Sequence, residues 1–137
     1  MADLYTHSFS DNVRFFKSKY MTYSNLAETE TEYNIVRIPK NALIVQMHVM
    51  VVTAFDGAVP TMTVGWTCSG EEDADGFLTN VETEIGVAGY KVPIAGTNIN
   101  AGGYYFADAS GTISVTIDPD TSTVGALYVF GGYTVIM

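Results

Sequence analysis

One long apolar run limits what this chain can fold into. Leu43–Phe55 reads LIVQMHVMVVTAF and contains no Asp, Glu, Lys or Arg. Val and Ile recur in it, and both sets of alternating positions are largely apolar, which favours a strand buried on both faces. Pro39 and Asn41 precede the run and Asp56-Gly57 follows it, as turn residues bound a strand. We therefore predict a central strand here.

The rest of the chain alternates short extended segments with turn residues. The tight turn Asp108 to Gly111 predicts a hairpin between the segments on either side of it, and the Gly131-Gly132 pair predicts a bulge. Residues 67–76 are the most polar stretch and predict a surface loop, while residues 25–32 show only a weak helical spacing. Seven further extended segments are expected: Tyr33–Ile38, Thr61–Trp66, Phe77–Ile85, Tyr90–Ile94, Gly102–Ala107, Thr112–Ile117 and Val124–Ile136.

This pattern predicts an all-β fold. About eight short strands in 137 residues must pack as two sheets or close as a barrel. We expect a single-domain antiparallel β-sandwich of jelly-roll type over residues 33–137. Residues 1–32 fit least well and are interpreted either as an extended N-terminal arm that packs on another chain or as the first strand of the sandwich.

The N-terminal segment carries the candidate partner-binding residues. Residues 1–40 contain five basic and five acidic side chains, whereas residues 41–137 contain one basic and ten acidic. The basic cluster could lie against an acidic surface, or it could be a solvated edge strand whose charges block unwanted pairing. The candidate contact residues combine these cations with the aromatic side chains nearby: Phe9, Arg14, Phe15, Phe16, Lys17, Lys19, Tyr20 and Tyr23.

The overall charge of −9 excludes several partner classes. Binding to nucleic acid or to an anionic membrane needs clustered Lys and Arg that most of this chain lacks. We expect no membrane span, because the apolar run is broken by Gln46 and His48 and is shorter than the ~20 residues that a bilayer requires. We also expect no secretory signal, and synthesis in a cytoplasm.

Catalytic patterns are weak. Cys68 is the only cysteine, so no intrachain disulfide can form, and His7 and His48 are the only histidines. His48 lies in the long apolar run, where a core or interface histidine is expected rather than a general base. A nucleophile needs a base and an orienting group within reach, and no spacing here predicts one. We expect a protein that is not an enzyme and that has no cofactor, calcium apart.

One motif resembles a metal site. Glu71, Asp73, Asp75 and Glu82 fall at positions 1, 3, 5 and 12 of a calcium-binding loop, with Gly76 at position 6. Position 1 is Glu rather than Asp, and the flanks predict strands instead of the two helices of an EF-hand. Calcium binding is one interpretation of this stretch, and a solvated acidic loop is the other.

Three segments carry a family resemblance. They are IPKNALIVQMHVMVVTAFDG (Ile38 to Gly57), TMTVGW (Thr61 to Trp66) and DADGFL (Asp73 to Leu78). Together they resemble a pattern in the small capsid decoration, or cement, proteins of tailed bacteriophages. The resemblance implies a β-sandwich, commonly a homotrimer, that sits on the outside of an icosahedral head and braces neighbouring capsomers. The family offers no motif of functional residues to transfer.

Two function hypotheses result. The first is a structural virion protein that binds the major capsid protein and stabilises the head, for which the many Tyr, Phe and Met side chains supply interface material. The second is a head-fibre or tail-associated module that binds a glycan or receptor through exposed aromatic and amide side chains. Its candidates are Trp66, Tyr104, Tyr105, Asn98 and Asn100.

Overall fold

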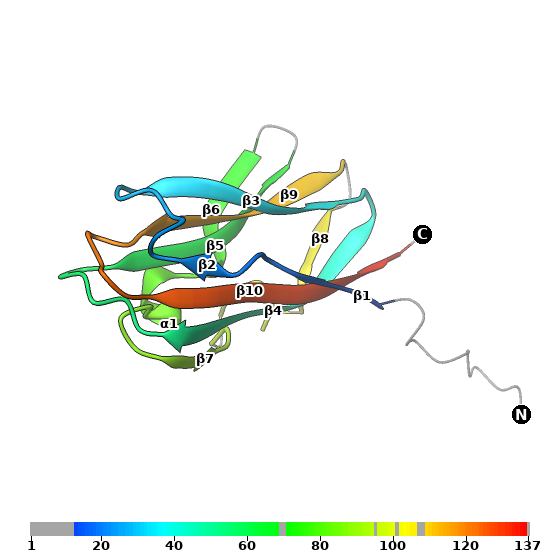
Figure 1. Ribbon diagram of the computed structural model, residues 1–137. Coiled ribbons are helices and arrows are strands. Elements are labelled where there is room, and N and C mark those ends of the chain that lie inside the picture. Colours follow the sequence, from blue (N-terminus) through cyan, green and yellow to red (C-terminus); the bar gives the residue numbers. More distant parts are fainter. Residues whose placement is uncertain (1–12, 69–70, 95, 101, 107–108, 137) are drawn as a thin grey trace, which may run out of the picture.

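The computed structural model is a sandwich of two antiparallel sheets (Figure 1). It describes residues 13–68, 71–94, 96–100, 102–106 and 109–136. The six-stranded sheet contains β1 (Val13–Lys17), β2 (Met21–Thr22), β4 (Ala42–Thr53), β7 (Gly89–Lys91), β8 (Tyr104–Phe106) and β10 (Ala126–Val135). The four-stranded sheet contains β3 (Thr31–Ile38), β5 (Thr61–Cys68), β6 (Glu71–Leu78) and β9 (Gly111–Asp118). The prediction of an all-β sandwich is confirmed.

The strand order is that of a jelly roll. The six-stranded sheet has the order β1-β10-β4-β7, with β2 continuing the β1 edge and β8 continuing the β7 edge. The four-stranded sheet has the order β3-β9-β5-β6. Except for the β5–β6 hairpin and the collinear pairs, each strand passes to the opposite sheet. Such crossing produces the two interlocked Greek keys of a jelly roll.

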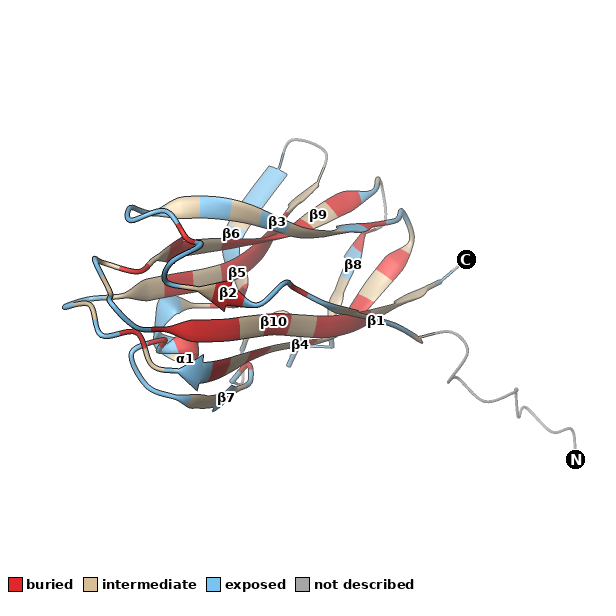
Figure 2. Cartoon of the chain, in the orientation of Figure 1, coloured by how far each residue is buried: buried red, intermediate tan, exposed pale blue. Residues whose placement is uncertain are grey.

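The core lies between the sheets, where both contribute their inward-facing apolar side chains (Figure 2). Strands β4 and β9 show the required period of two, because Ile113, Val115 and Ile117 are buried and alternate with smaller polar residues. From the six-stranded sheet, Val49 and Val129 are fully buried and face each other in the β4–β10 register. The large fully buried side chains include Phe77, Phe106, Ile38, Ile44, Met47, Met62, Leu78, Ile85 and Leu127.

Strand β4 departs from the prediction in one respect. It was expected to be buried on both faces, but only its inward residues are covered. On the outward face Val45 and Val52 are exposed, and His48 and Met50 are half-buried. Strands buried on both faces and strands with an apolar outer surface have the same hydrophobic pattern, so periodicity could not separate them. The outward apolar side chains of β4 therefore form part of the protein surface.

The predicted loop over residues 67–76 is wrong. β5 extends to Cys68 and β6 begins at Glu71, so the acidic residues lie on a strand paired antiparallel with β5. The pairing is irregular between Val64 and Trp66, where β6 has extra residues. Gly65 explains this path, because a Cβ on it would overlap the Asp73 carbonyl and Ala74. The close approach of β6 overrides the low strand propensity of Asp and Glu.

Two other local predictions are also wrong. Residues 77–85 were expected to be extended, but the helix α1 (Asn80–Thr83) follows β6. Thr79 caps it, and the reciprocal bonds between Thr79 and Glu82 form a capping box, which the spacing T-x-x-E encodes. The segments around residues 108–111 do not form a hairpin, because β8 pairs with β4 whereas β9 pairs with β3 and β5. Residues 23–26 form turns and a bend, not a helix.

The predicted bulge near Gly131-Gly132 is confirmed by a register shift between Gly132 and Tyr133 against β4. The two glycines also accommodate strand β1. A Cβ on Gly132 would lie 3.1 Å from Phe15 Cδ1, and one on Gly131 would lie 2.9 Å from Phe16 Cζ. The two Phe rings thus occupy, on opposite faces of the sheet, the space that side chains on the two glycines would fill.

Gly65 gives a stability prediction. Gly65→Ala should lower the free energy of unfolding by roughly 1–3 kcal/mol, because the new methyl group must displace the β6 backbone rather than a flexible side chain. Urea denaturation followed by circular dichroism measures the change. Gly86→Ala is the matched control, because the nearest atom to its Cβ would be Pro60 Cγ at 3.6 Å. Equal stability of the two variants would contradict the close approach.

Candidate docking face of the six-stranded sheet

The structure separates the candidate contact residues of the N-terminal segment. Arg14, Phe15, Phe16 and Lys17 lie on β1, an edge strand paired with β10, and Lys19 and Tyr20 lie in the link to β2. Tyr23 lies in the turn after β2, and its amide donates to the carbonyl of Gly125. Phe9 lies outside the described residues.

Strand alternation sends the β1 side chains to opposite faces. Phe16 points inward and packs against the core. Phe15 and Lys17 point outward, opposite Gly132 and Phe130 of β10. The Phe15 side chain is 72% exposed, and Lys17 Nζ lies 4.9 Å from the centre of the Tyr128 ring. β1 therefore adds an exposed aromatic ring and a cation to the outer face of the sheet.

The outer face continues as a row of rings across β10, β4 and β7. His48 is opposite Phe130 in the register, and their ring centres are 5.3 Å apart. Tyr90 of the edge strand β7 stacks on His48 at 5.3 Å and lies 6.1 Å from Phe130. Tyr20 stacks on Tyr128 at 4.7 Å. We call this surface the aromatic face: Phe15, Lys17, Tyr20, His48, Met50, Tyr90, Tyr128 and Phe130.

His48 is held in this row as a half-buried group. Its Nε2 lies 3.1 Å from Gln46 Oε1, and its buried Nδ1 has no hydrogen-bond partner among the described residues. Desolvation lowers the pKa of His48 below its usual value of 6.5, so the neutral ring is favoured at neutral pH. A neutral imidazole fits an apolar contact surface.

The opposite outer face has a different chemistry. On the four-stranded sheet the outward positions of β5 and β9 are hydroxyl side chains, and β6 adds one carboxylate opposite Thr67: Thr63, Thr67, Thr112, Ser114, Thr116 and Glu72. Polar residues here are expected for a sheet face in water. The aromatic face is thus one side of the sandwich only, and its exposed rings make that side the candidate docking surface.

The acidic residues of the calcium pattern are not arranged as a loop. Glu71, Asp73 and Asp75 alternate along β6, whereas Glu82 caps α1 and its Oε2 accepts the amide of Ile94 at 2.8 Å. Among the residues that the structure describes, no group of three or more His, Cys, Asp or Glu is placed to hold one metal ion. Calcium binding stays a prediction of the sequence pattern.

The pKa of the Asp73 carboxyl group is shifted upward. Burial and then the hydrogen bond and negative charge of Asp75 raise the pKa of Asp73 above its usual 3.8. The folded protein therefore binds this proton more tightly than the unfolded chain does, so stability falls as the pH rises through the unfolded and then the folded pKa.

We therefore expect Asp73→Asn to raise the melting temperature at pH 7, where the like-charge contact is fully present. The gain should disappear at about pH 3, which is below the raised pKa of Asp73, so that this carboxyl group is largely protonated. Thermal melts at the two pH values measure this, with Glu30→Gln in an exposed turn as the control. A lower melting temperature for Asp73→Asn at pH 7 would contradict the argument.

The candidate glycan-binding residues make contacts within the fold. Trp66 is buried, its ring centre lies 3.9 Å from that of Tyr104, and it also contacts Phe77. Asn98 Nδ2 donates to the Gly76 carbonyl at 2.9 Å, and Asn100 Nδ2 donates to the Pro93 carbonyl. The Tyr105 hydroxyl donates to Asn41 Oδ1. Tyr105 is nevertheless 43% exposed, and Trp66 and Tyr104 line a shallow pocket of about 430 Å³ with carboxylates of β6, so glycan binding stays a prediction.

His48 and Cys68 do not form a catalytic pair. His48 is on the outer face of the six-stranded sheet, and Cys68 ends β5 in the other sheet. Cys68 Sγ lies 3.5 Å from the carbonyl oxygen of Ala109. In the described part of the chain, no helix is long and apolar enough to cross a membrane.

Sequence reasoning missed most of the aromatic face. Tyr90, Tyr128, Phe130, His48 and Met50 lie on three strands that are distant in sequence. The available signal was the excess of apolar residues in the segments at residues 43–55 and 124–136, where both alternating sets are apolar. The segment at residues 43–55 was interpreted as a strand buried on both faces, which hid this signal.

The fold and its two outer faces define a small jelly-roll protein with one aromatic and one polar outer side. No protein-family model and no curated protein matches the sequence. Solved phage capsids, however, contain chains of similar fold. One is the cyanophage Pam1 capsid asymmetric unit, with TM-score 0.66 and 14% identity over 98% of this chain and 94% of that chain.

Two further capsids give the same result. The acid-stable capsid of Helicobacter pylori bacteriophage KHP30 matches with TM-score 0.65 and 15% identity, over 95% of this chain and 90% of that chain. The capsid of Ralstonia phage GP4 matches with TM-score 0.65 and 15% identity, over 91% and 84%. The shared feature is the fold.

Proposed function

We propose that this chain is a structural protein of a phage head, a decoration or cement protein that binds the outside of the shell and bridges neighbouring capsomers. The aromatic face carries the proposal. It places several exposed or half-buried rings on one side of a rigid sheet, whereas the other outer face is hydroxyl-rich. Aromatic side chains and Met are enriched at protein interfaces, which supports a protein partner.

The partner in this proposal is the major capsid protein of the same virion. The fold that the chain shares with components of three phage capsids supports that choice over other protein partners. A bracing protein acts through contacts and requires no catalytic group, so its role is structural rather than enzymatic. Placement on the virion surface follows from the same proposal.

We also propose a homotrimer, as the resemblance to decoration proteins implies. Three copies joined about one axis present three aromatic faces to symmetry-related capsomers. Linked contacts gain effective concentration, so individually weak contacts can hold firmly when they engage together. The acidic surface outside β1 then faces solvent and disfavours non-specific association.

Co-sedimentation tests the function. The purified protein is mixed with heads that lack it, and both fractions are quantified after centrifugation. We expect saturable binding and heads that resist heating better after binding. Light scattering of the free protein should give a mass close to three chains. Absence of binding to heads would overturn the proposed function, whereas a monomer that binds heads would overturn only the trimer.

A further inference from the structure

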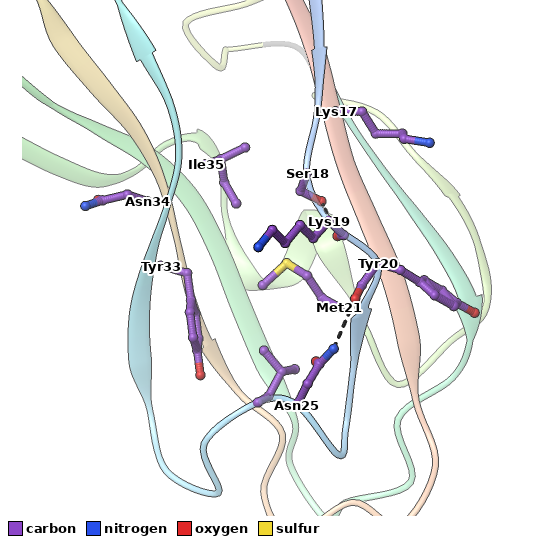
Figure 3. A pocket seen from close by; sticks show the side chains of 10 residues that line it. Lys17, Ser18, Lys19, Tyr20, Met21, Asn25, Tyr33, Asn34 and Ile35 are labelled. Atoms are coloured by element: carbon purple, nitrogen blue, oxygen red, sulfur yellow. Dashed lines mark hydrogen bonds between the residues drawn. The ribbon is translucent and has the colours of Figure 1, made fainter.

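A second surface lies beside the aromatic face and differs from it. The edge of the six-stranded sheet and the edge of the four-stranded sheet leave a groove of about 680 Å³ between them (Figure 3). We call it the edge groove. The residues used below are Lys19, Met21, Asn25, Leu26, Tyr33 and Ile35. Its volume is within the range of ordinary ligand sites.

The groove has an apolar floor. Met21 and Leu26 are buried core residues, and Ile35 and Tyr33 are partly buried against the same core. In Figure 3 the side chains of Met21 and Ile35 point into the groove from opposite sides. Ile35 lies at the irregularity in the β3–β9 register between Asn34 and Val36, which leaves it without a Cα partner on β9.

Hydrogen bonds hold the walls in place. The Tyr33 hydroxyl accepts the amide of Ala27 at 2.8 Å. Asn25 Oδ1 accepts the amide of Thr22 at 2.8 Å, and Asn25 Nδ2 donates to the Tyr20 carbonyl at 3.2 Å. A partner therefore does not have to order these side chains, which lowers the cost of binding.

Lys19 gives the groove a charge. The Ser18 hydroxyl lies 2.9 Å from the Val129 amide, which donates to it, and fixes the link after β1. β1 ends at Lys17, so strand alternation does not continue through the link, and Figure 3 shows the Lys19 side chain directed into the groove and the Lys17 side chain directed away from it. Among the described residues Lys19 forms no ion pair. A cation above an apolar floor is complementary to a carboxylate that is flanked by apolar groups.

Two strand edges border the groove. Among the strands that the structure describes, β1 ends the six-stranded sheet and β3 ends the four-stranded sheet. Unpaired edge strands can accept an extended peptide, which supplies the missing main-chain hydrogen bonds. These features favour a peptide over a compact small molecule.

We propose that the edge groove binds an extended segment of the capsid protein that carries an Asp or Glu beside apolar side chains. The carboxylate pairs with Lys19, and the apolar neighbours cover Met21 and Ile35. This inference rests on the proposed function and names a second contact besides the aromatic face. A carboxylate of a second copy of this chain is the alternative occupant, and the coupling experiment below distinguishes the two.

Carbodiimide coupling tests the pairing directly. The reagent joins a lysine amine to a carboxylate that touches it, and mass spectrometry of digested, decorated heads identifies both peptides. We expect Lys19 to be joined to an acidic residue of the capsid protein. Linkage of Lys19 only to carboxylates of this same chain, or no Lys19 linkage on heads that retain the protein, would overturn the proposal.

Substitutions give an independent measurement. Lys19→Glu should weaken binding to heads by roughly tenfold or more, because it places like charges together, whereas Lys19→Arg should bind normally. Lys40→Glu, in the exposed turn before β4, is the control with the same change of charge. Equal binding by Lys19→Glu and Lys40→Glu would contradict the groove contact.

The two proposals fail in different ways. If the unaltered protein binds heads while Lys19→Glu binds equally well and Lys19 is not coupled, the groove inference is wrong and the proposed function stands. If the unaltered protein does not bind heads, both are wrong. Circular dichroism of each variant confirms that the loss concerns binding and not folding.

Discussion

Phe15→Asp and Tyr90→Asp are each expected to weaken binding to phage heads by at least roughly thirtyfold, the effect of losing an aromatic interface anchor. Phe15 is 72% exposed on β1 and Tyr90 is 52% exposed on β7, so the two sites lie on opposite edges of the same sheet. A carboxylate at either position must be desolvated when the aromatic face is covered, which opposes docking.

The fold should tolerate both substitutions, because neither side chain belongs to the core. Val81→Asp is the matched control. Val81 is also 72% exposed, and it lies in the first turn of α1, where a negative charge suits the helix N-terminus. Co-sedimentation gives the affinities, and thermal melts check folding. Undiminished binding by both aromatic variants would remove the aromatic face from the proposed function.

Trp66→Ala is expected to lower the free energy of unfolding by roughly 3–5 kcal/mol, the usual cost of removing a large buried ring. The Trp66 ring fills the space between Tyr104 and Phe77, with centre-to-centre distances of 3.9 and 5.0 Å. It also lies where a side chain on Gly76 would be, so Gly76 has no side chain that could fill the cavity left by its removal.

Trp66→Phe should keep most of the stability, because an aromatic ring remains between the same neighbours. Urea denaturation of the three proteins measures the difference. The same experiment separates the two early hypotheses. A Trp66→Ala protein that is as stable as the unaltered one would contradict the core role of Trp66 and return it to consideration as a glycan platform.

The sequence predicted individual strands well where alternation and turn residues within one short segment were sufficient. The segments at residues 33–38, 43–55, 61–66, 112–117 and 124–136 all overlap observed strands. Alternation and turn residues act over a few positions, so they are visible in one chain without its partners. The all-β class followed from the same local signals.

The positions of the candidate contact residues in the fold could be predicted only in part, and their contact with a partner stays a prediction. Phe15, Lys17 and Tyr20 were chosen because cations and aromatic residues cluster in one short segment, and the structure places all three on the aromatic face. Phe16 came from the same cluster, but its ring packs against the core. Composition cannot assign neighbouring residues to opposite faces until the partner strand is known.

The sequence alone determined most of the extended segments, β6 and α1 apart, and that they must pack as two sheets or close as a barrel, since those properties depend on local periodicity and chain length. Only the tertiary structure decided which apolar side is core and which is surface. β4 has apolar residues on both sides, and the four-stranded sheet covers just the inward one. The same long-range pairing brings β1 next to β10 and sets β3 across from β1, so the aromatic face and the edge groove exist only after strands distant in sequence have met.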